Sequence, residues 1–277
     1  MTPYYERNGI AIFCGDCLEV MPGLELEFDA IIADLPFGIT ACDWDTVIPF
    51  EPLWREYKRL IKANGAVVLF GSQPFTSMLV MSNLEWFKHE WIWQKNTGGN
   101  FLNVVREPMK EHESVLLFSS GNSTYNRQMQ NRSEAGIKRQ SSPFQPSALS
   151  DNYNNFTPKV VEREVFFRVP SSVQKFNREL GLHPTQKPVS LISYMVRTYT
   201  NPGELIIDNA MGSGTTLLAA QNEGRRAIGI EISEEYCKIA VDRLRQPSFF
   251  SLPTTNGNVE ARQLELMPSE EGGLHER

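Results

Sequence analysis

The chain has 277 residues, of which 41% are apolar and 22% are charged, and both fractions are ordinary for a globular protein. This composition excludes a wholly disordered chain, a fibrous repeat and a small disulfide-stabilised scaffold. No apolar run approaches the roughly 18 residues that a membrane span needs. The first ten residues also lack the basic and apolar pattern of a signal peptide, so we expect a cytoplasmic protein with no membrane partner.

The net charge of −6 is unevenly distributed along the chain. Residues 95–178 carry 12 Lys and Arg against 7 Asp and Glu, whereas the rest of the chain carries 15 against 26. An acidic balance does not by itself indicate a nucleic-acid partner. The middle third is the only basic region, and its simplest interpretation is a solvated, loop-rich insert.

The four cysteines do not follow a metal-binding pattern. Cys14 and Cys17 form a single C-x-x-C, while Cys42 and Cys237 stand apart. A zinc site needs a second pair of ligands at matching spacing, and none is present. A C-x-x-C pair also suits redox chemistry. We interpret the cysteines as ordinary reduced residues and expect no metal.

The first regular unit predicted along the chain is strand, helix, strand. The apolar run Ala30–Ala33 predicts a buried strand that stops at Asp34. Helical spacing over 53–61 predicts a helix, with Asn64–Gly65 as its C-terminal stop. A second strand is predicted over Ala66–Phe70.

The middle of the chain begins with regular elements and then loses its pattern. Pro74 can begin a helix that continues to Met81, and strands are expected over Trp91–Trp93 and Ser114–Phe118. From Ser119 to about Pro158 the sequence is rich in Ser, Asn, Gln and Pro. This stretch is a long loop, a small recognition lobe or disordered.

Regular alternation resumes near Pro188 and ends with a helix capped by Ser233. Alternating strands and helices predict an α/β fold, with a mixed, mostly parallel sheet and helices on both faces. After Pro247 the sequence is polar and acidic, which indicates a loose tail. The elements expected before it are a helix over 191–199, a strand over 205–208, a helix ending at Gly224 and a strand over 227–230.

A ligand-binding turn is predicted between the strand that ends at Asp208 and the next helix. Ligands of open α/β sheets bind at the carboxyl ends of strands. Gly212 and Gly214 let the backbone approach a ligand closely, and the helix start offers free N–H groups. Glu231 ends the following strand, where a carboxylate can bind two ribose hydroxyls.

The same turn departs from the dinucleotide-binding pattern, because Leu217 stands where the third glycine is required. The spacing also serves S-adenosyl-L-methionine, which has no pyrophosphate, and Asp208 could then hold the methionine ammonium. The alternative is a tight strand-to-helix turn without a ligand.

Three segments together resemble a known family. Asp34-Leu35-Pro36-Phe37 resembles the D-P-P-[YF] motif of DNA methyltransferases that modify exocyclic amines. Residues 208–216 resemble their cofactor motif D-P-F-x-G-S-G-T, and residues 183–188 resemble the H-P-T-Q-K-P that precedes it. The order of catalytic motif, recognition region and cofactor motif is similar to the beta class, and the match covers about 10–120 and 180–245.

The resemblance implies a Rossmann-like, S-adenosylmethionine-dependent methyltransferase fold with permuted motif order and a loop-rich recognition insert. Residues 1–94 are then the catalytic half, 95–180 the target-recognition region and 181–246 the cofactor-binding half, with 247–277 as the flexible tail. The positive balance of the insert suits phosphate contacts.

The resemblance also implies a role for each residue of the first motif. The Asp34 carboxylate accepts one hydrogen bond from the target amine, and a main-chain carbonyl of Leu35 or Pro36 accepts another. Phe37 offers a face on which the base can stack. A base inside a duplex is out of reach, so it must first be flipped out of the helix.

The expected activity is site-specific methylation of the adenine amine in double-stranded DNA. Asp34 favours adenine, because the cytosine enzymes more often carry serine there. The alternatives are an N4-cytosine DNA methyltransferase and a non-catalytic homologue that binds the cofactor and DNA. A homodimer and a restriction endonuclease partner are further expectations from the family.

Four positions depart from the family pattern: Leu35 replaces a proline, Phe37 a tyrosine, and Asn209–Ala210 the usual Pro-Phe. The residues expected to bind the cofactor belong to the catalytic motif, to the segment before Pro188, and to the strand ends. They are Asp16, Asp34, Thr185, Gln186, Lys187, Asp208, Asn209, Ala210, Gly212, Ser213, Gly214, Thr215, Thr216 and Glu231.

Overall fold

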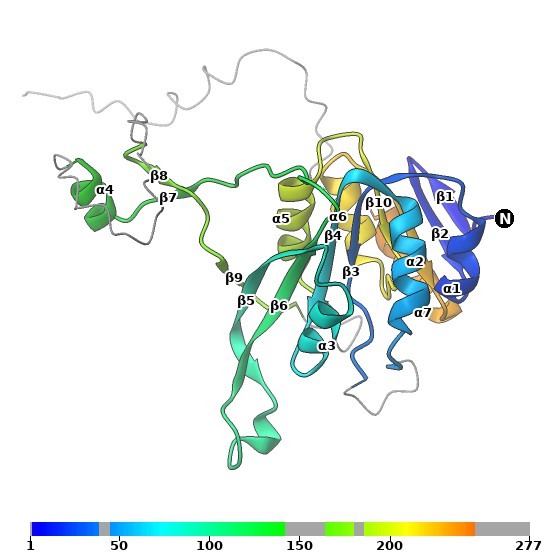
Figure 1. The fold of residues 1–277 in the computed structure, drawn as a ribbon, viewed down its shortest axis with the longest axis horizontal. Coiled ribbons are helices and arrows are strands. Elements are labelled where there is room, and N and C mark those ends of the chain that lie inside the picture. Colours follow the sequence, from blue (N-terminus) through cyan, green and yellow to red (C-terminus); the bar gives the residue numbers. More distant parts are fainter. Residues whose placement is uncertain (1, 39–44, 142–163, 180–185, 247–277) are drawn as a thin grey trace, which may run out of the picture. The chain divides into compact units, whose positions relative to one another are not determined.

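The computed structural model of the chain describes residues 2–38, 45–141, 164–179 and 186–246. Its centre is a nine-stranded sheet in the order β1-β2-β11-β10-β3-β4-β6-β5-β9 (Figure 1). In that order the strands are β1 Tyr5–Arg7, β2 Ile10–Cys14, β11 Arg226–Glu231, β10 Leu205–Asp208, β3 Phe28–Ala33, β4 Ile61–Gly71, β6 Lys110–Phe118, β5 Phe87–Gly99 and β9 Val173–Phe176.

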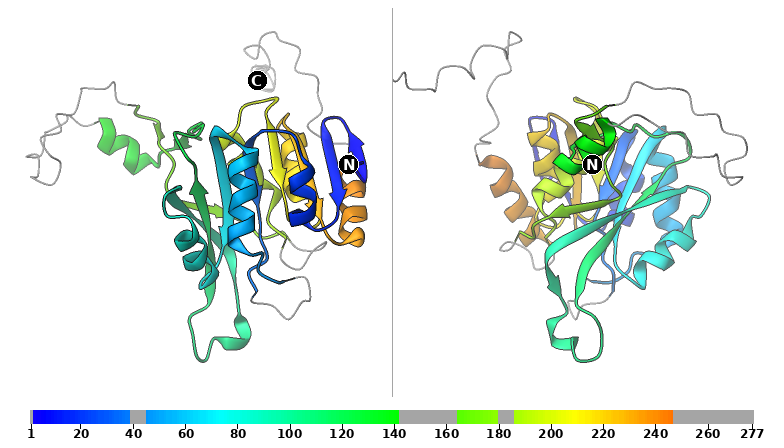
Figure 2. Two further views of the ribbon diagram at one scale, coloured as in Figure 1. Left: turned by 45° about the vertical axis from the view of Figure 1, so that its right-hand side comes forward. Right: turned by 90° about the vertical axis from the view of Figure 1, so that its left-hand side faces the viewer.

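Helices cover both faces of this sheet (Figure 2). One hydrophobic cluster joins one face to α1, α2 and α3, and a second joins the other face to α5, α6 and α7. The predicted α/β fold is therefore confirmed. The bounds of these helices are α1 Cys17–Val20, α2 Phe50–Leu60, α3 Phe75–Ser82, α5 Val189–Tyr199, α6 Thr215–Asn222 and α7 Glu234–Arg245.

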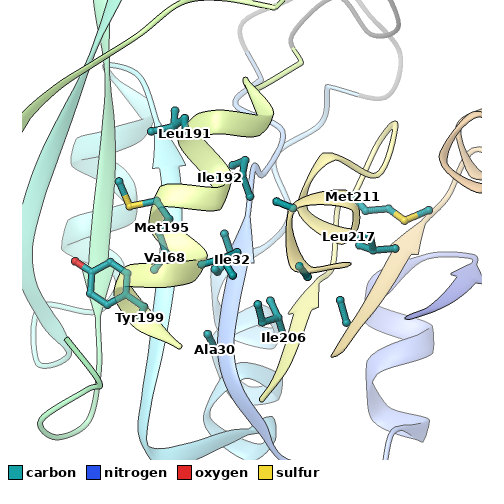
Figure 3. Packing of buried hydrophobic residues seen from close by; sticks show 14 of the residues in the cluster. Ala30, Ile32, Val68, Leu191, Ile192, Met195, Tyr199, Ile206, Met211 and Leu217 are labelled. Atoms are coloured by element: carbon teal, nitrogen blue, oxygen red, sulfur yellow. The ribbon is translucent and has the colours of Figure 1, made fainter. Parts of the chain in front are cut away.

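Parallel pairing joins five neighbouring strands, from β2 through β11, β10 and β3 to β4. Successive side chains along β3 enter opposite clusters, with Ile31 in one and Ile32 in the other. A strand buried on both faces needs apolar residues at every position, as 30–33 provide. Figure 3 shows Ile32 of β3 and Val68 of β4 packed with α5.

Strands β5 and β6 form an antiparallel hairpin on the far side of β4. The hairpin extends past the carboxyl ends of β3 and β4, at the lower edge of Figure 1, and ends in a short 3-10 turn over Phe101–Asn103. A separate two-stranded ribbon pairs β7 Gln130–Asn131 with β8 Phe167–Arg168, and α4 Glu134–Ser141 follows β7.

The structure corrects two expectations from the sequence. Helix α2 ends at Leu60, and Asn64–Gly65 lie inside β4, so they are not the stop of that helix. The chain passes directly from α2 into β4: the amide of Ile61 makes the last helical bond, to the carbonyl of Tyr57, but the backbone of Ile61 is already extended (φ −88°, ψ 137°), so the helix ends without a glycine. In addition, a boundary at residue 95 falls inside β5, so part of the proposed recognition region belongs to the main sheet.

The first hairpin, β1–β2, was not predicted from the sequence. The Asn8–Gly9 dipeptide is typical of such a turn, and in the structure both residues have positive φ and join the two strands. Several expectations lie outside the described residues: the tail 247–277, part of the Ser/Asn-rich stretch, and the segment 180–185. Within the described part of the chain, no helix is long and apolar enough to cross a membrane.

Two tyrosines of α5 provide a matched test of the core. The hydroxyl of Tyr199 accepts a hydrogen bond from Trp91 Nε1 at 2.6 Å, whereas the buried hydroxyl of Tyr194 has no partner. We expect Tyr199→Phe to lower the free energy of unfolding by about 1–3 kcal/mol, because it strands a buried indole N–H. Tyr194→Phe should be neutral or slightly stabilising. Urea denaturation checks both, and equal losses would contradict the hydrogen-bond assignment.

Candidate active site

The predicted site residues meet at one edge of the sheet. Because β2, β11, β10, β3 and β4 are parallel, their carboxyl ends lie together, and a cavity of about 520 Å³ opens there. Every described residue of the predicted set except Gly214 lines this cavity. Thr185 lies outside the described residues, as does His183.

Asp34 is placed by the end of β3. One carboxylate oxygen, Oδ2, accepts a hydrogen bond from Lys187 Nζ at 2.6 Å. The other oxygen, Oδ1, is buried and has no hydrogen-bond partner. Burial raises the pKa of Asp34, and the neighbouring Lys187 ammonium opposes that rise. The site therefore presents a carboxylate oxygen that a donor from a substrate could satisfy.

Packing holds the residues that follow Asp34. Leu35, which replaces the family proline, is 3% exposed and belongs to the cluster around α2 and α3. Burial of its side chain fixes the backbone where a proline ring would otherwise restrict φ. Phe37 stacks on Phe75 with ring centroids 5.0 Å apart, and it lines the cavity.

Asp208 lies next to Asp34 because β10 and β3 are neighbours. It is 3% exposed and accepts hydrogen bonds from the Ala210 amide at 3.1 Å and from the Thr216 side chain. Burial, with smaller contributions from the Asp34 and Glu231 carboxylates, raises the pKa of Asp208 to about 7. A cation in the cavity would favour the ionised form.

Glu231 ends β11 and connects it to the glycine turn. Its carboxylate accepts from the Gly212 amide at 2.9 Å and from the Ser233 amide at 2.8 Å. Each oxygen keeps a second lone pair for a ligand hydroxyl. Burial raises the pKa of Glu231.

The turn before α6 is held from behind by α7. The buried side chain of Arg243 donates to the Ser213 carbonyl at 2.6 Å and to the Thr215 hydroxyl at 3.1 Å. Gly214 has a φ of +77°, and a Cβ there would lie 2.7 Å from the Cβ of Ala240. Gly214 therefore acts by close packing and not as a wall of the cavity, and Arg243 was not anticipated from the sequence.

Asn209, which stands where the family usually has proline, is held by contacts of its own side chain. Asn209 is 3% exposed; its Oδ1 accepts from the Tyr57 hydroxyl at 2.5 Å, and its amide lies 3.5 Å from Cys17 Sγ. These contacts bind the turn to α1 and α2. Asp16 lines the same cavity, and its carboxylate also caps α1 by accepting from the Leu18 amide at 2.8 Å.

Lys187 is neither a surface charge nor remote from the catalytic motif. Its side chain is 5% exposed, and besides Asp34 it pairs with Glu113 Oε2 at 3.2 Å. Glu113 in turn pairs with Lys95 at 2.5 Å. Glu113 was not predicted as a site residue from the sequence, although its position directly before the predicted strand 114–118 was a signal for one. Gln186 lines the cavity with a buried Oε1 that has no partner.

The cavity walls are mixed in character, with carboxylates at the strand ends and apolar side chains between them. Among the described residues, no group of three or more His, Cys, Asp or Glu side chains could hold a metal ion. The apolar walls that the sequence analysis did not name come from Val47, Ile48, Ile192, Ile232 and Tyr236.

Comparison with known proteins gives one family. The family model described as "DNA methylase", N6_N4_Mtase, matches residues 28–242. Type II methyltransferase M2.DpnII of Streptococcus pneumoniae is 28% identical over 268 residues, covering 87% of this chain and 92% of the relative. DNA adenine methyltransferase YhdJ of Escherichia coli (strain K12) is also 28% identical, covering 89% and 86%.

Solved structures agree with these relatives. The complex of M1.HpyAVI with SAM has a TM-score of 0.58 and 26% identity, covering 84% of this chain and 99% of that one. The PvuII DNA methyltransferase, which is cytosine-N4-specific, has a TM-score of 0.61 at 15% identity, covering 89% and 90%. Because the PvuII enzyme is only 15% identical, its similarity concerns the fold alone.

The packing of Gly214 against α7 can be tested with matched glycines. Gly214→Ala and Gly224→Ala both place a side chain at positive φ, at a cost of roughly 1–2 kcal/mol each. Only Gly214→Ala also clashes with Ala240, so we expect it to lower the free energy of unfolding more. In a double-mutant cycle Ala240→Gly should recover part of that difference. If urea denaturation gave equal decreases in the free energy of unfolding for the two variants, the close contact would be ruled out.

Proposed function

The chain belongs to the N6/N4 DNA methylase family, and on that premise we propose that it is an adenine-specific member, which methylates the exocyclic amine of adenine after base flipping. As a member of the family it is a DNA methyltransferase that uses S-adenosyl-L-methionine and acts on double-stranded DNA. The proposal concerns the base, the roles of the residues and the flipping step.

One observation carries the proposal: Asp34 Oδ1 is buried and has no hydrogen-bond partner, in a residue that lines the cavity. Leaving a buried carboxylate oxygen unsatisfied costs free energy, so the site is prepared for a donor. An exocyclic amine is such a donor. A hydrogen bond to the carboxylate, together with one to a main-chain carbonyl of Leu35 or Pro36, favours a pyramidal nitrogen whose lone pair is available.

The rest of the cavity fits the cofactor. We assign the Asp208 carboxylate to the methionine ammonium and Glu231 to the ribose hydroxyls, because both carboxylates are buried in the lining of the cavity. Ile232 and Tyr236 supply apolar surface near Glu231. Asp16, Gln186 and the cavity-lining residues of the turn complete the set that we assign to cofactor binding, with Thr185 assigned from the resemblance; the turn residues are Asn209, Ala210, Gly212, Ser213, Thr215 and Thr216.

When bound, the cofactor would supply an electrophilic methyl group; its transfer to the amine nitrogen would leave the bonding pair on sulfur and release one proton from nitrogen to solvent. The protein contributes orientation, which can be worth about 7–11 kcal/mol of the barrier. Asp34 aligns the amine, and Phe37 offers a stacking surface worth about 1–3 kcal/mol. No side chain has to act as a nucleophile.

Adenine is favoured over cytosine by two observations. Asp34 stands where the cytosine enzymes more often have serine, and the curated relative YhdJ is named as an adenine methyltransferase. An N4-cytosine activity uses the same geometry and is the second candidate. A restriction endonuclease partner, a homodimer and target recognition by the basic region 95–180 remain predictions from the resemblance.

The direct test is to map modified bases in DNA from cells that express the protein, using long-read sequencing and an Asp34→Ala control. We expect N6-methyladenine confined to one short sequence motif in the wild type. Asp34→Ala should lower the methylation rate by about 100-fold or more, the range for loss of one preorganised polar contact.

The outcomes separate the candidates. Detection of N4-methylcytosine would support the same mechanism and identify cytosine, not adenine, as the target base. An unmodified genome, combined with cofactor binding measured by calorimetry, would favour the non-catalytic homologue. Wild-type methylation by Asp34→Ala would remove Asp34 from the reaction.

Cofactor affinity should depend on pH through Asp208. Its pKa of about 7 in the free protein means that below pH 7 the carboxyl must lose a proton before it can pair with the ammonium. We expect affinity for S-adenosyl-L-methionine to fall as pH decreases from 7.5 to 5.5, approaching tenfold per unit. Calorimetry measures it, with Asp208→Asn as the control that should bind weakly and without this dependence. A flat wild-type profile would contradict the assignment.

A further inference from the structure

Four charged side chains form a row of alternating sign beside the catalytic motif. Lys95 Nζ lies 2.5 Å from Glu113 Oε1, Lys187 Nζ lies 3.2 Å from Glu113 Oε2, and Lys187 Nζ lies 2.6 Å from Asp34 Oδ2. We call this set the charged row. Its members come from β5, β6, the segment before α5 and the end of β3, so only the folded chain brings them together.

The charged row is largely buried. Side-chain exposure is 11% for Lys95, 14% for Glu113, 5% for Lys187 and 25% for Asp34. A charge left alone in such a place is expensive, so each member requires its neighbours. Two cations and two anions make the charged row neutral, and it reaches solvent mainly at Asp34, where the cavity begins.

The contact between Lys187 and Asp34 is one-sided. Lys187 Nζ also lies 5.4 Å from the centre of the Phe37 ring and 5.5 Å from that of Phe70, which confines the ammonium on two further sides. It therefore reaches only Oδ2, and Oδ1 is left buried and without a partner. An Asp side chain with one oxygen held in this way cannot turn its carboxylate freely.

Glu113 fixes the other side of Lys187. The neighbouring residue Ser114 pairs with Gly71 at the end of β4, so β6 delivers Glu113 directly to the edge where Asp34 lies. Lys95 holds the first oxygen of Glu113, and Lys187 takes the second. The carboxylate of Glu113 is thus set by the sheet and not by a flexible loop.

We propose that Lys187, held by Glu113, is a positioning residue for methyl transfer: it occupies Oδ2 of Asp34 and so keeps Oδ1 aimed at the target amine. The inference rests on the proposed function and adds two residues to it. Neither residue touches the reacting atoms. Both act through the Asp34 carboxylate: Lys187 fixes its orientation and favours its ionised form, and Glu113 holds Lys187 in place.

The two positioning residues affect Asp34 with opposite sign. Burial raises the pKa of Asp34, the Lys187 ammonium lowers it, and the Glu113 carboxylate raises it, while Lys95 lowers it more weakly. Among the described residues, Asp208 on β10 also interacts with Asp34, and the carboxylates of Asp16, Asp45 and Glu231 line the same cavity. Removing Lys187 should therefore raise the pKa of Asp34, and neutralising Glu113 should lower it.

The test compares Lys187→Met, Glu113→Gln, the double variant and Lys62→Met in the full chain. Lys62 serves as the matched control, because it pairs with Asp29 on the surface and is 47% exposed. Titration of carboxyl 13C signals by NMR reports Asp34 in the free protein, with the signal assigned by its loss in Asp34→Asn. Single-turnover methylation of DNA against pH and calorimetry with S-adenosyl-L-methionine complete the set.

We expect Lys187→Met to raise the midpoint of the Asp34 titration by about one unit or more, and to shift the acidic limb of the rate profile in the same direction. At pH values below the shifted midpoint, the methylation rate of Lys187→Met should be about tenfold lower than that of Lys62→Met. Glu113→Gln should move both midpoints the other way. The double variant removes one charge of each sign and so keeps the site neutral. Its two midpoints should therefore lie at lower pH than those of Lys187→Met.

Two results would overturn the inference. In the first, the Asp34 titration stays in place in Lys187→Met while affinity for S-adenosyl-L-methionine falls, which assigns Lys187 to cofactor binding. In the second, both single variants lose activity without opposite shifts, which assigns the charged row to stability alone. Because the NMR titration uses the free protein, failure of the proposed activity in the wild type leaves this readout intact.

Discussion

Parallel pairing of β10 with β3 is the constraint on which the site depends. The register Ile206 to Ala30 and Ile207 to Ile31 brings together two segments that lie far apart in the chain. Both strands are buried on both faces, so a slip by one residue would move apolar side chains out of both clusters. Asp34 and Asp208 each directly follow or end one of these strands, and the pairing therefore places them at the same edge. The catalytic and cofactor motifs become one cavity through main-chain hydrogen bonds and apolar packing, before any polar contact between them is made.

Buried charge is the second common feature of the site. Three carboxylates, those of Asp34, Asp208 and Glu231, lie at neighbouring strand ends, where burial raises the pKa of each. The structure holds them in different ways. Asp34 has an ammonium partner, Asp208 accepts from an amide and a hydroxyl, and Glu231 accepts from two amides. The ammonium partner of Asp34 leaves one carboxylate oxygen without a hydrogen bond, whereas the neutral donors to Asp208 leave its pKa near 7. In the proposed function, the same kind of side chain thus meets an amine donor in one place and a cation in the other.

Departures from the family motif are compensated by tertiary packing. Leu35 lacks the fixed φ of proline, but its side chain is buried against α2 and α3. Asn209 lacks the ring of the usual proline, but Tyr57 and Cys17 hold its amide. In each case a long-range contact supplies the rigidity that the family obtains within the motif. A motif search scores such positions as losses, although the three-dimensional structure retains the backbone path.

The sequence by itself determined the α/β class, the strands at 30–33, 66–70, 205–208 and 227–230, and the residues that end them, because periodicity and turn residues are local signals. It also contained the Asn8–Gly9 dipeptide of the first hairpin, and its Asn64–Gly65 signal gave the wrong end for α2, because the backbone becomes extended at Ile61 and enters β4 there. Tertiary structure alone decided that Lys187 pairs with Asp34 and Glu113, that Arg243 holds the turn before α6, and that Gly214 packs against α7. These contacts join residues 28 to 153 positions apart, or a glycine to a neighbouring helix, and depend on strand order and helix placement, which no local pattern encodes.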